Sequence, residues 1–78
     1  MIEAQEAVRR AREAFLALHE DPTITEVQLA EVELSSDDRF WLVTLSYADD
    51  EVSAISKHKV LKIDAASGQV RSMHIRTL

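Results

Sequence analysis

The residues of this chain that could do chemistry gather around its only glycine. Asp64 lies four residues before Gly68, and His58 and His74 flank the same segment. A carboxylate and two imidazoles are side chains used in general acid–base catalysis and in zinc sites. A zinc site needs three or four ligands, and no other residue of that chemistry has a spacing that would bring it near. We therefore predict neither a bound metal nor a catalytic Asp64.

A turn explains the spacing of Asp64 and Gly68 better than a catalytic site does. Asp side chains accept backbone N–H hydrogen bonds across tight turns, and glycine adopts positive φ at little cost. The pair therefore predicts a hairpin that joins the β-prone runs 59–64 and 70–76.

The length of the hairpin loop decides which side chains of the last strand share a face, because side chains alternate along a strand. A four-residue loop, 65–68, is the preferred prediction and puts His58 and His74 on opposite faces. A five-residue loop would exchange the faces of the last strand and bring the two histidines together. The preferred loop gives two groups: Leu61, Ile63 and Val70 on one face, and Val60, Met73 and Ile75 on the other.

Other signatures of catalysis or ion binding are missing from the sequence. The acidic runs Asp37-Asp38 and Asp49-Asp50-Glu51 lack the spaced carboxylates and central glycine of a calcium loop. The chain has no cysteine, no G-x-S-x-G motif and no glycine-rich phosphate loop. We predict a protein that is not an enzyme and has no cofactor.

Apolar spacing predicts the elements that position these residues. A period of about 3.6 residues from Glu3 to about His19 predicts an amphipathic helix, which Pro22 ends. Strands are predicted over 24–34 and 40–47, and the polar connection 48–56 is expected to be the most mobile segment. The predicted helix-facing residues are Ala4, Ala7, Val8, Ala11, Ala14, Phe15 and Leu18 of the helix, and Trp41, Val43, Leu45 and Tyr47 of the second run.

The run 24–34 changes its apolar phase midway. Val27 and Leu29 alternate on one face, whereas Val32 and Leu34 fall on the other. A regular period of two cannot produce this change, so we predict a β-bulge near Ala30-Glu31 that returns the later pair to the core face.

These elements predict an α+β fold in the order α-β-β-β-β, with an N-terminal α-helix packed on a four-stranded antiparallel β-meander. Residues 1–78 are expected to form a single domain. One helix can cover only one face of a sheet, so the remaining apolar residues predict an interaction surface. These residues are Phe40, Leu42, Val60, Met73 and Ile75.

The charges divide unevenly along the chain. Of the 14 acidic residues, 13 lie in residues 1–51, and residues 52–78 carry five of the nine basic ones. The two halves are expected to attract each other, and the net charge of −5 disfavours nucleic acid as a partner. The acidic N-terminus and the lack of an apolar run of about 20 residues predict a cytoplasmic protein with no membrane partner.

The predicted hairpin resembles that of the PepSY family of small helix-plus-meander domains. Such domains carry a hydrophobic-x-hydrophobic-D-A-x-T-G-x-V pattern after an α-helix, and the matching residues here are Val60, Ile63, Asp64, Ala65, Gly68 and Val70. The chain is also similar to small stand-alone bacterial proteins of uncharacterised role. PepSY domains are mostly non-enzymatic and are thought to bind or inhibit peptidases or other partners.

The resemblance implies a non-catalytic protein-interaction module with a regulatory or inhibitory role. The alternative is a structural protein that forms a homodimer through the same sheet face.

Overall fold

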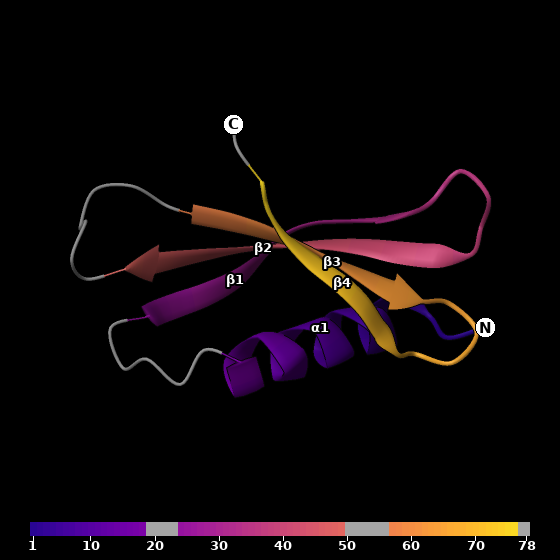
Figure 1. The fold of residues 1–78 in the computed structure, drawn as a ribbon, viewed down its shortest axis with the longest axis horizontal. Helices are drawn as coiled ribbons and strands as arrows, with labels where there is room; N and C mark the ends of the chain where they lie inside the picture. The colour runs from indigo at the N-terminus through magenta and orange to yellow at the C-terminus, as the bar shows by residue number, and fades with distance from the viewer. Residues whose placement is uncertain (19–23, 50–56, 77–78) are drawn as a thin grey trace.

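A computed structural model describes residues 1–18, 24–49 and 57–76 of the chain. Helix α1 (Ala4–Leu18) is followed by strands β1 (Ile24–Leu34), β2 (Phe40–Asp49), β3 (Lys57–Asp64) and β4 (Val70–Arg76). The strands form one antiparallel sheet in the order β1-β2-β3-β4, and Figure 1 shows α1 along one side of it. The predicted α+β fold is confirmed.

Helix α1 follows its predicted amphipathic pattern. Ala7, Ala11 and Phe15 are buried against the sheet. On the polar side, Arg9 pairs with Glu6 and, at 2.6 Å, with Glu13. The helix ends at Leu18, which is exposed, while the predicted end at His19 and Pro22 lies outside the described residues.

The core lies between α1 and the facing side chains of β2 and β3. The small alanines of α1 let the helix approach closely, and the Phe15 and Tyr47 rings meet with centroids 5.0 Å apart. Trp41 packs at the margin and donates its indole N–H to the carbonyl of Ile2 at 3.0 Å. The buried core cluster is Ala7, Ala11, Phe15, Val43, Leu45, Tyr47, Leu61 and Ile63.

Strand β1 contains the predicted bulge. Leu29 pairs with Leu45, but Glu31 pairs with Thr44, so Ala30 is the extra residue. The bulge returns Val32 to the core side, as predicted. A second register shift, between Thr25 and Gln28, was not predicted.

Residues 65–69 lie between β3 and β4, and a backbone hydrogen bond from Asp64 to Gln69 closes the predicted four-residue loop, 65–68. The amide of Asp64 donates to the carbonyl of Gln69 at 2.8 Å, and Ile63 pairs with Val70. Gly68 has the expected positive φ, 78°. The turn also packs against α1, because a Cβ atom on Gly68 would lie 2.7 Å from Nε of Arg10.

The register of β4 changes immediately after the loop. Lys62 pairs with Ser72 and Leu61 with Met73, so Arg71 is an extra residue in a β-bulge. The bulge moves Met73 and Ile75 to the same side of the sheet as Leu61. The prediction that these two residues share a face with Val60 is therefore wrong.

The predicted polar connection 48–56 is shorter in the structure, since Ala48 and Asp49 belong to β2. The remainder of it lies outside the described residues.

Candidate functional site

The sheet has an inner face, which packs against α1, and an outer face, which points away from it. Side-chain alternation and cross-strand pairing define the outer face. Within the described ranges, no helix or strand lies over it. Its side chains are Gln28, Glu31 and Glu33 of β1; Phe40, Leu42, Thr44 and Ser46 of β2; His58, Val60, Lys62 and Asp64 of β3; and Ser72 and His74 of β4.

Three of the five predicted interaction residues meet on this face. Phe40 and Leu42 are two residues apart on β2, so their side chains lie on the same face. Val60 lies diagonally across from Leu42 on β3. All three side chains are half-buried. We call Phe40, Leu42 and Val60 the apolar strip, which follows the two central strands.

The other two predicted residues lie on the inner face. Met73 packs against the core cluster, and Ile75 pairs with Lys59 near the end of β4 with 74% of its surface exposed. The Arg71 bulge thus removes both from the apolar strip. The prediction of one continuous five-residue surface is corrected to a strip of three.

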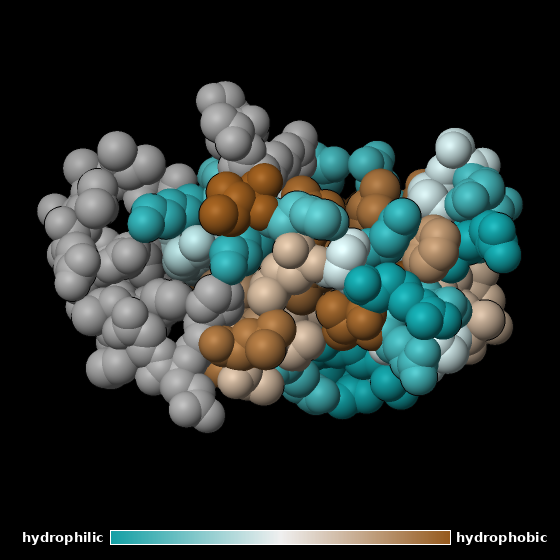
Figure 2. Space-filling model, in the orientation of Figure 1, coloured by the Kyte–Doolittle hydropathy of each residue, from teal (hydrophilic) through white to brown (hydrophobic). Residues whose placement is uncertain are grey.

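The exposed apolar residues away from the strip are divided between elements in the described part of the chain. Ile75 lies on β4, whereas Leu16 and Leu18 lie on α1. In the view of Figure 2, hydrophobic patches are separated by hydrophilic side chains. Single exposed apolar residues are normal on protein surfaces and need no partner to explain them.

A lysine partly covers the apolar strip. Nζ of Lys62 lies 4.4 Å from the centroid of the Phe40 ring, which is the geometry of a cation–π contact. The lysine stem lies along apolar surface and keeps the ammonium group in water. Lys62 is not part of the buried core cluster.

The ionisable side chains of the outer face differ between its strands. The β1 edge contributes Glu31 and Glu33, whereas β3 contributes Lys62, Asp64 and His58, and β4 contributes His74. The meander order puts β1 and β4 at opposite edges, so the two glutamates lie apart from these side chains. Sequence reasoning named none of these flanking charges as site residues. The sequence does contain a signal for Glu31 and Glu33. They alternate with the core-facing residue Val32, which predicts that their side chains lie on the outer face.

Neither edge strand is regular. Strand β1 carries register shifts at two places and β4 carries the bulge at Arg71. Bulges at sheet edges interrupt the row of backbone groups that an added strand would pair with. The outer face is therefore a better contact surface than either edge.

His58 and His74 lie on the outer face together, because His74 pairs with Val60 and His58 with Arg76. This is the arrangement that the five-residue loop would have given, and the Arg71 bulge produces it with a four-residue loop. No group of three or more metal-ligating side chains occurs among residues 1–18, 24–49 and 57–76.

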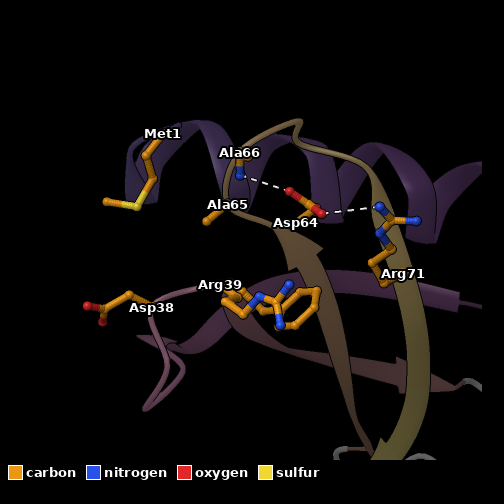
Figure 3. A pocket seen from close by; sticks show the side chains of 8 residues that line it. Met1, Asp38, Arg39, Asp64, Ala65, Ala66 and Arg71 are labelled. Carbon is orange, nitrogen blue, oxygen red and sulfur yellow. Dashed lines mark hydrogen bonds and ion pairs between the residues drawn. The ribbon is translucent and has the colours of Figure 1, made fainter.

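A pocket of about 490 Å³ opens where the two hairpin turns meet the N-terminus. Figure 3 shows Asp64 and Arg71 on one side of this pocket, with Arg39 and Asp38 on the other. The amides of Ala66 and Ser67 donate to Oδ1 of Asp64 at 2.8 and 3.0 Å, and Arg71 contacts Oδ2 at 3.2 Å.

These contacts define the chemistry of Asp64. The N–H groups of Ser67 and Ala66, and then Arg71, hold the pKa of the Asp64 carboxyl below its ordinary value of 3.8. The side chain is therefore ionised at neutral pH and cannot serve as a general acid there. The predicted turn role of Asp64 is confirmed.

Asp37 has a similar role in the β1–β2 turn. The Ser35 hydroxyl donates to its Oδ1 at 2.6 Å, and the Arg39 amide donates at 3.2 Å. These bonds, the Ser35 contact first, lower the pKa of Asp37. Its carboxylate orders a turn in which Asp38 has a φ of 60°. Asp50 and Glu51 of the second acidic run lie outside the described residues.

Comparison of the chain with protein-family models, with curated proteins and with solved structures finds no match. No helix in the described part of the chain is long and apolar enough to cross a membrane. The candidate site therefore rests on the geometry of the outer face.

Proposed function

We propose that this protein is a non-catalytic, PepSY-like interaction module with a regulatory or inhibitory role in the cytoplasm, and that it binds its partner through the outer face. The observation that carries the proposal is the apolar strip of Phe40, Leu42 and Val60 on the two central strands. Half-buried apolar side chains bounded by charges are typical of a contact surface.

The chemistry of the pocket favours binding over catalysis. Asp64 is engaged by two amides and by Arg71, and Arg71 is held by the same carboxylate. The hydrogen bonds and the ion pair made by Asp64 and Arg71 stabilise the β3–β4 turn.

Affinity capture with matched variants tests the proposal. The wild-type chain, Leu42→Lys and Leu16→Lys are immobilised and exposed to extract of the native cell, and bound proteins are identified by mass spectrometry. Leu16 is half exposed on α1, so its variant adds the same charge away from the outer face. Thermal unfolding verifies that each variant is folded.

We expect the wild type and Leu16→Lys to retain the same protein, which can be untagged copies of this chain, and Leu42→Lys to lose it. Retention of that protein by folded Leu42→Lys would contradict the outer face as the binding surface.

A further inference from the structure

We infer that the pocket between the two hairpin turns binds a small organic molecule that carries a single carboxylate on an apolar body. The inference goes beyond the proposed function, because the pocket shares only Phe40 with the apolar strip. It follows from the charged and apolar side chains that line the pocket.

The fold brings two arginines from different parts of the sheet to this pocket. Phe40, at the start of β2, pairs with Asp64, at the end of β3. The amide of Ala65 donates to the carbonyl of Arg39 at 2.9 Å, which extends this pairing by one residue. Arg71 approaches from β4, where its guanidinium contacts Oδ2 of Asp64 at 3.2 Å. Arg39 and Arg71 therefore line one pocket of about 490 Å³, a volume typical of small-molecule sites.

Arg39 offers the pocket a guanidinium that is not engaged elsewhere in the described part of the chain. No hydrogen bond or ion pair joins this guanidinium to residues 1–18, 24–49 or 57–76. The Ser35 hydroxyl is the largest cause of the lowered pKa of Asp37, and the charge of Arg39 is the smallest. The coupling of Arg39 to Asp37 is therefore weak, and its N–H groups are available to an anion.

The carboxylates that line the pocket leave the charge of Arg39 uncompensated. Asp64 is held by two backbone amides and by Arg71, so these two side chains compensate each other. The Asp38 carboxylate points away from both arginines in Figure 3. A ligand with one negative charge balances Arg39, whereas a dianion such as phosphate would place excess charge close to Asp64.

The geometry of the donors favours a carboxylate among singly charged anions. A guanidinium presents paired N–H donors in one plane, which match the two oxygens of a carboxylate. Arg71 uses Nη2 for Asp64, and its remaining N–H groups can donate to the same ligand.

Apolar atoms complete the pocket. Ala65 is buried and Phe40 is half-buried, and Met1 and Ala66 also line the cavity. An apolar body of a few carbon atoms is expected to contact Phe40 and Ala65 and to lose water on binding. The pocket should therefore prefer an organic acid to an inorganic anion.

An NMR titration tests the inference with hexanoate as the probe. Backbone amide signals of the isotope-labelled chain are recorded at neutral pH and constant ionic strength while hexanoate, hexanamide or phosphate is added. Hexanamide has the same apolar body without the charge, and phosphate has the charge without the apolar body. Arg39→Gln removes the proposed contact, and Arg12→Gln removes a charge from an exposed position of α1 as a control.

We expect hexanoate to shift the amide signals of Ala65 and Ala66 saturably, with a dissociation constant of about 1–10 mM. The signals of Gln28 and Ser46, which pair toward the other end of the sheet, should stay constant. Arg39→Gln, hexanamide and phosphate should each weaken binding by about ten-fold or more, and Arg12→Gln should leave it within about two-fold.

Equal shifts with hexanoate and hexanamide, or unchanged hexanoate binding by folded Arg39→Gln, would overturn the carboxylate site. Tighter binding of phosphate than of hexanoate would overturn the class of ligand. Leu42 does not line the pocket, so Leu42→Lys should bind hexanoate as the wild type does. The two proposals can therefore fail independently.

Discussion

The same strands form the inner and outer faces of the sheet, but among the described residues only the inner face is covered by a second layer. Val43 and Leu61 on the inner face are fully buried at 0% exposure, whereas their sequence neighbours Leu42 and Val60 on the outer face are only half-buried. Helix α1 supplies the second layer on one side. On the other side, the described residues supply none. The comparison separates residues that hold the fold from residues that are available for contact.

The two faces also differ in where their charged side chains lie. On the inner face, Lys57 and Lys59 of β3 lie outside the buried core cluster, which contains only apolar residues and the Tyr47 ring. On the outer face, Glu31 and Glu33 lie on one side of the apolar strip, and Lys62 and Asp64 lie on the other. Such a border limits nonspecific association and favours a partner of matching charge.

The largest expected effect is at the inner face. Phe15→Ala removes a fully buried ring that contacts Tyr47, and we expect the free energy of unfolding to fall by about 3–5 kcal/mol. Urea denaturation measures this loss, with Leu16→Ala on the exposed side of α1 as control. A loss below about 1 kcal/mol would mean that α1 does not complete the inner face.

The next effect is at the turn that joins the hairpin to α1. Gly68→Val places a β-branched residue at a φ of 78° and its Cβ against Arg10, so we expect a loss of about 1–3 kcal/mol. Adding Arg10→Ala to Gly68→Val should recover only the part of this loss that comes from contact between the introduced valine side chain and Arg10. The part that comes from the positive φ should remain. Unchanged thermal stability of Gly68→Val would show that the turn assignment is wrong.

A smaller effect on stability is expected at the outer face. Leu42→Lys should change the free energy of unfolding by less than about 1 kcal/mol while weakening binding of the captured partner at least ten-fold. Val43→Lys, one residue away, buries a charge against α1 and should prevent stable folding. Equal losses of stability in the two variants would remove the distinction between the faces.

The smallest effect is the pH dependence of the hairpin turn. The lowered pKa of Asp64 means that its carboxylate stabilises the fold above the ordinary value of 3.8, and this contribution is lost as pH falls through the folded-state pKa. Asp64→Asn should therefore have a melting temperature that falls less than that of the wild type between pH 5 and pH 2.

Asp38→Asn in the other turn is the control, because Asn tolerates the positive φ at that position. Identical acid profiles for the wild type and Asp64→Asn would contradict the role assigned to the carboxylate.

Patterns of period 3.6 and period two predicted the helix, the strand order and the bulge at Ala30. The same reasoning did not find the bulge at Arg71. Val70 and Met73 are three residues apart, as are Leu29 and Val32, and each spacing fits either a bulge or a strand with two apolar faces. For β4 the sequence predicts a strand with two apolar faces, whereas the packing of Met73 and the Arg71–Asp64 pair in the structure show a bulge.

The flanking charges were missed for a topological reason. Opposite charges in the two halves of a chain predict attraction, but they do not say whether the strands that carry them are neighbours. The meander places β1 and β3 on opposite sides of β2, so Glu31 and Glu33 border the apolar strip on one side and Lys62 borders it on the other.

Methyl NMR spectra of the wild-type chain, recorded before and after addition of the captured partner, test the central claim, that the outer face is the contact surface, most directly. Leu42 and Val60 report on the outer face, and their sequence neighbours Val43 and Leu61 report on the inner face of the same strands. We predict that addition of the partner shifts the Leu42 and Val60 methyl signals and leaves those of Val43 and Leu61 nearly unchanged. Outer-face signals that stay constant, or larger shifts on the inner face, would contradict the account.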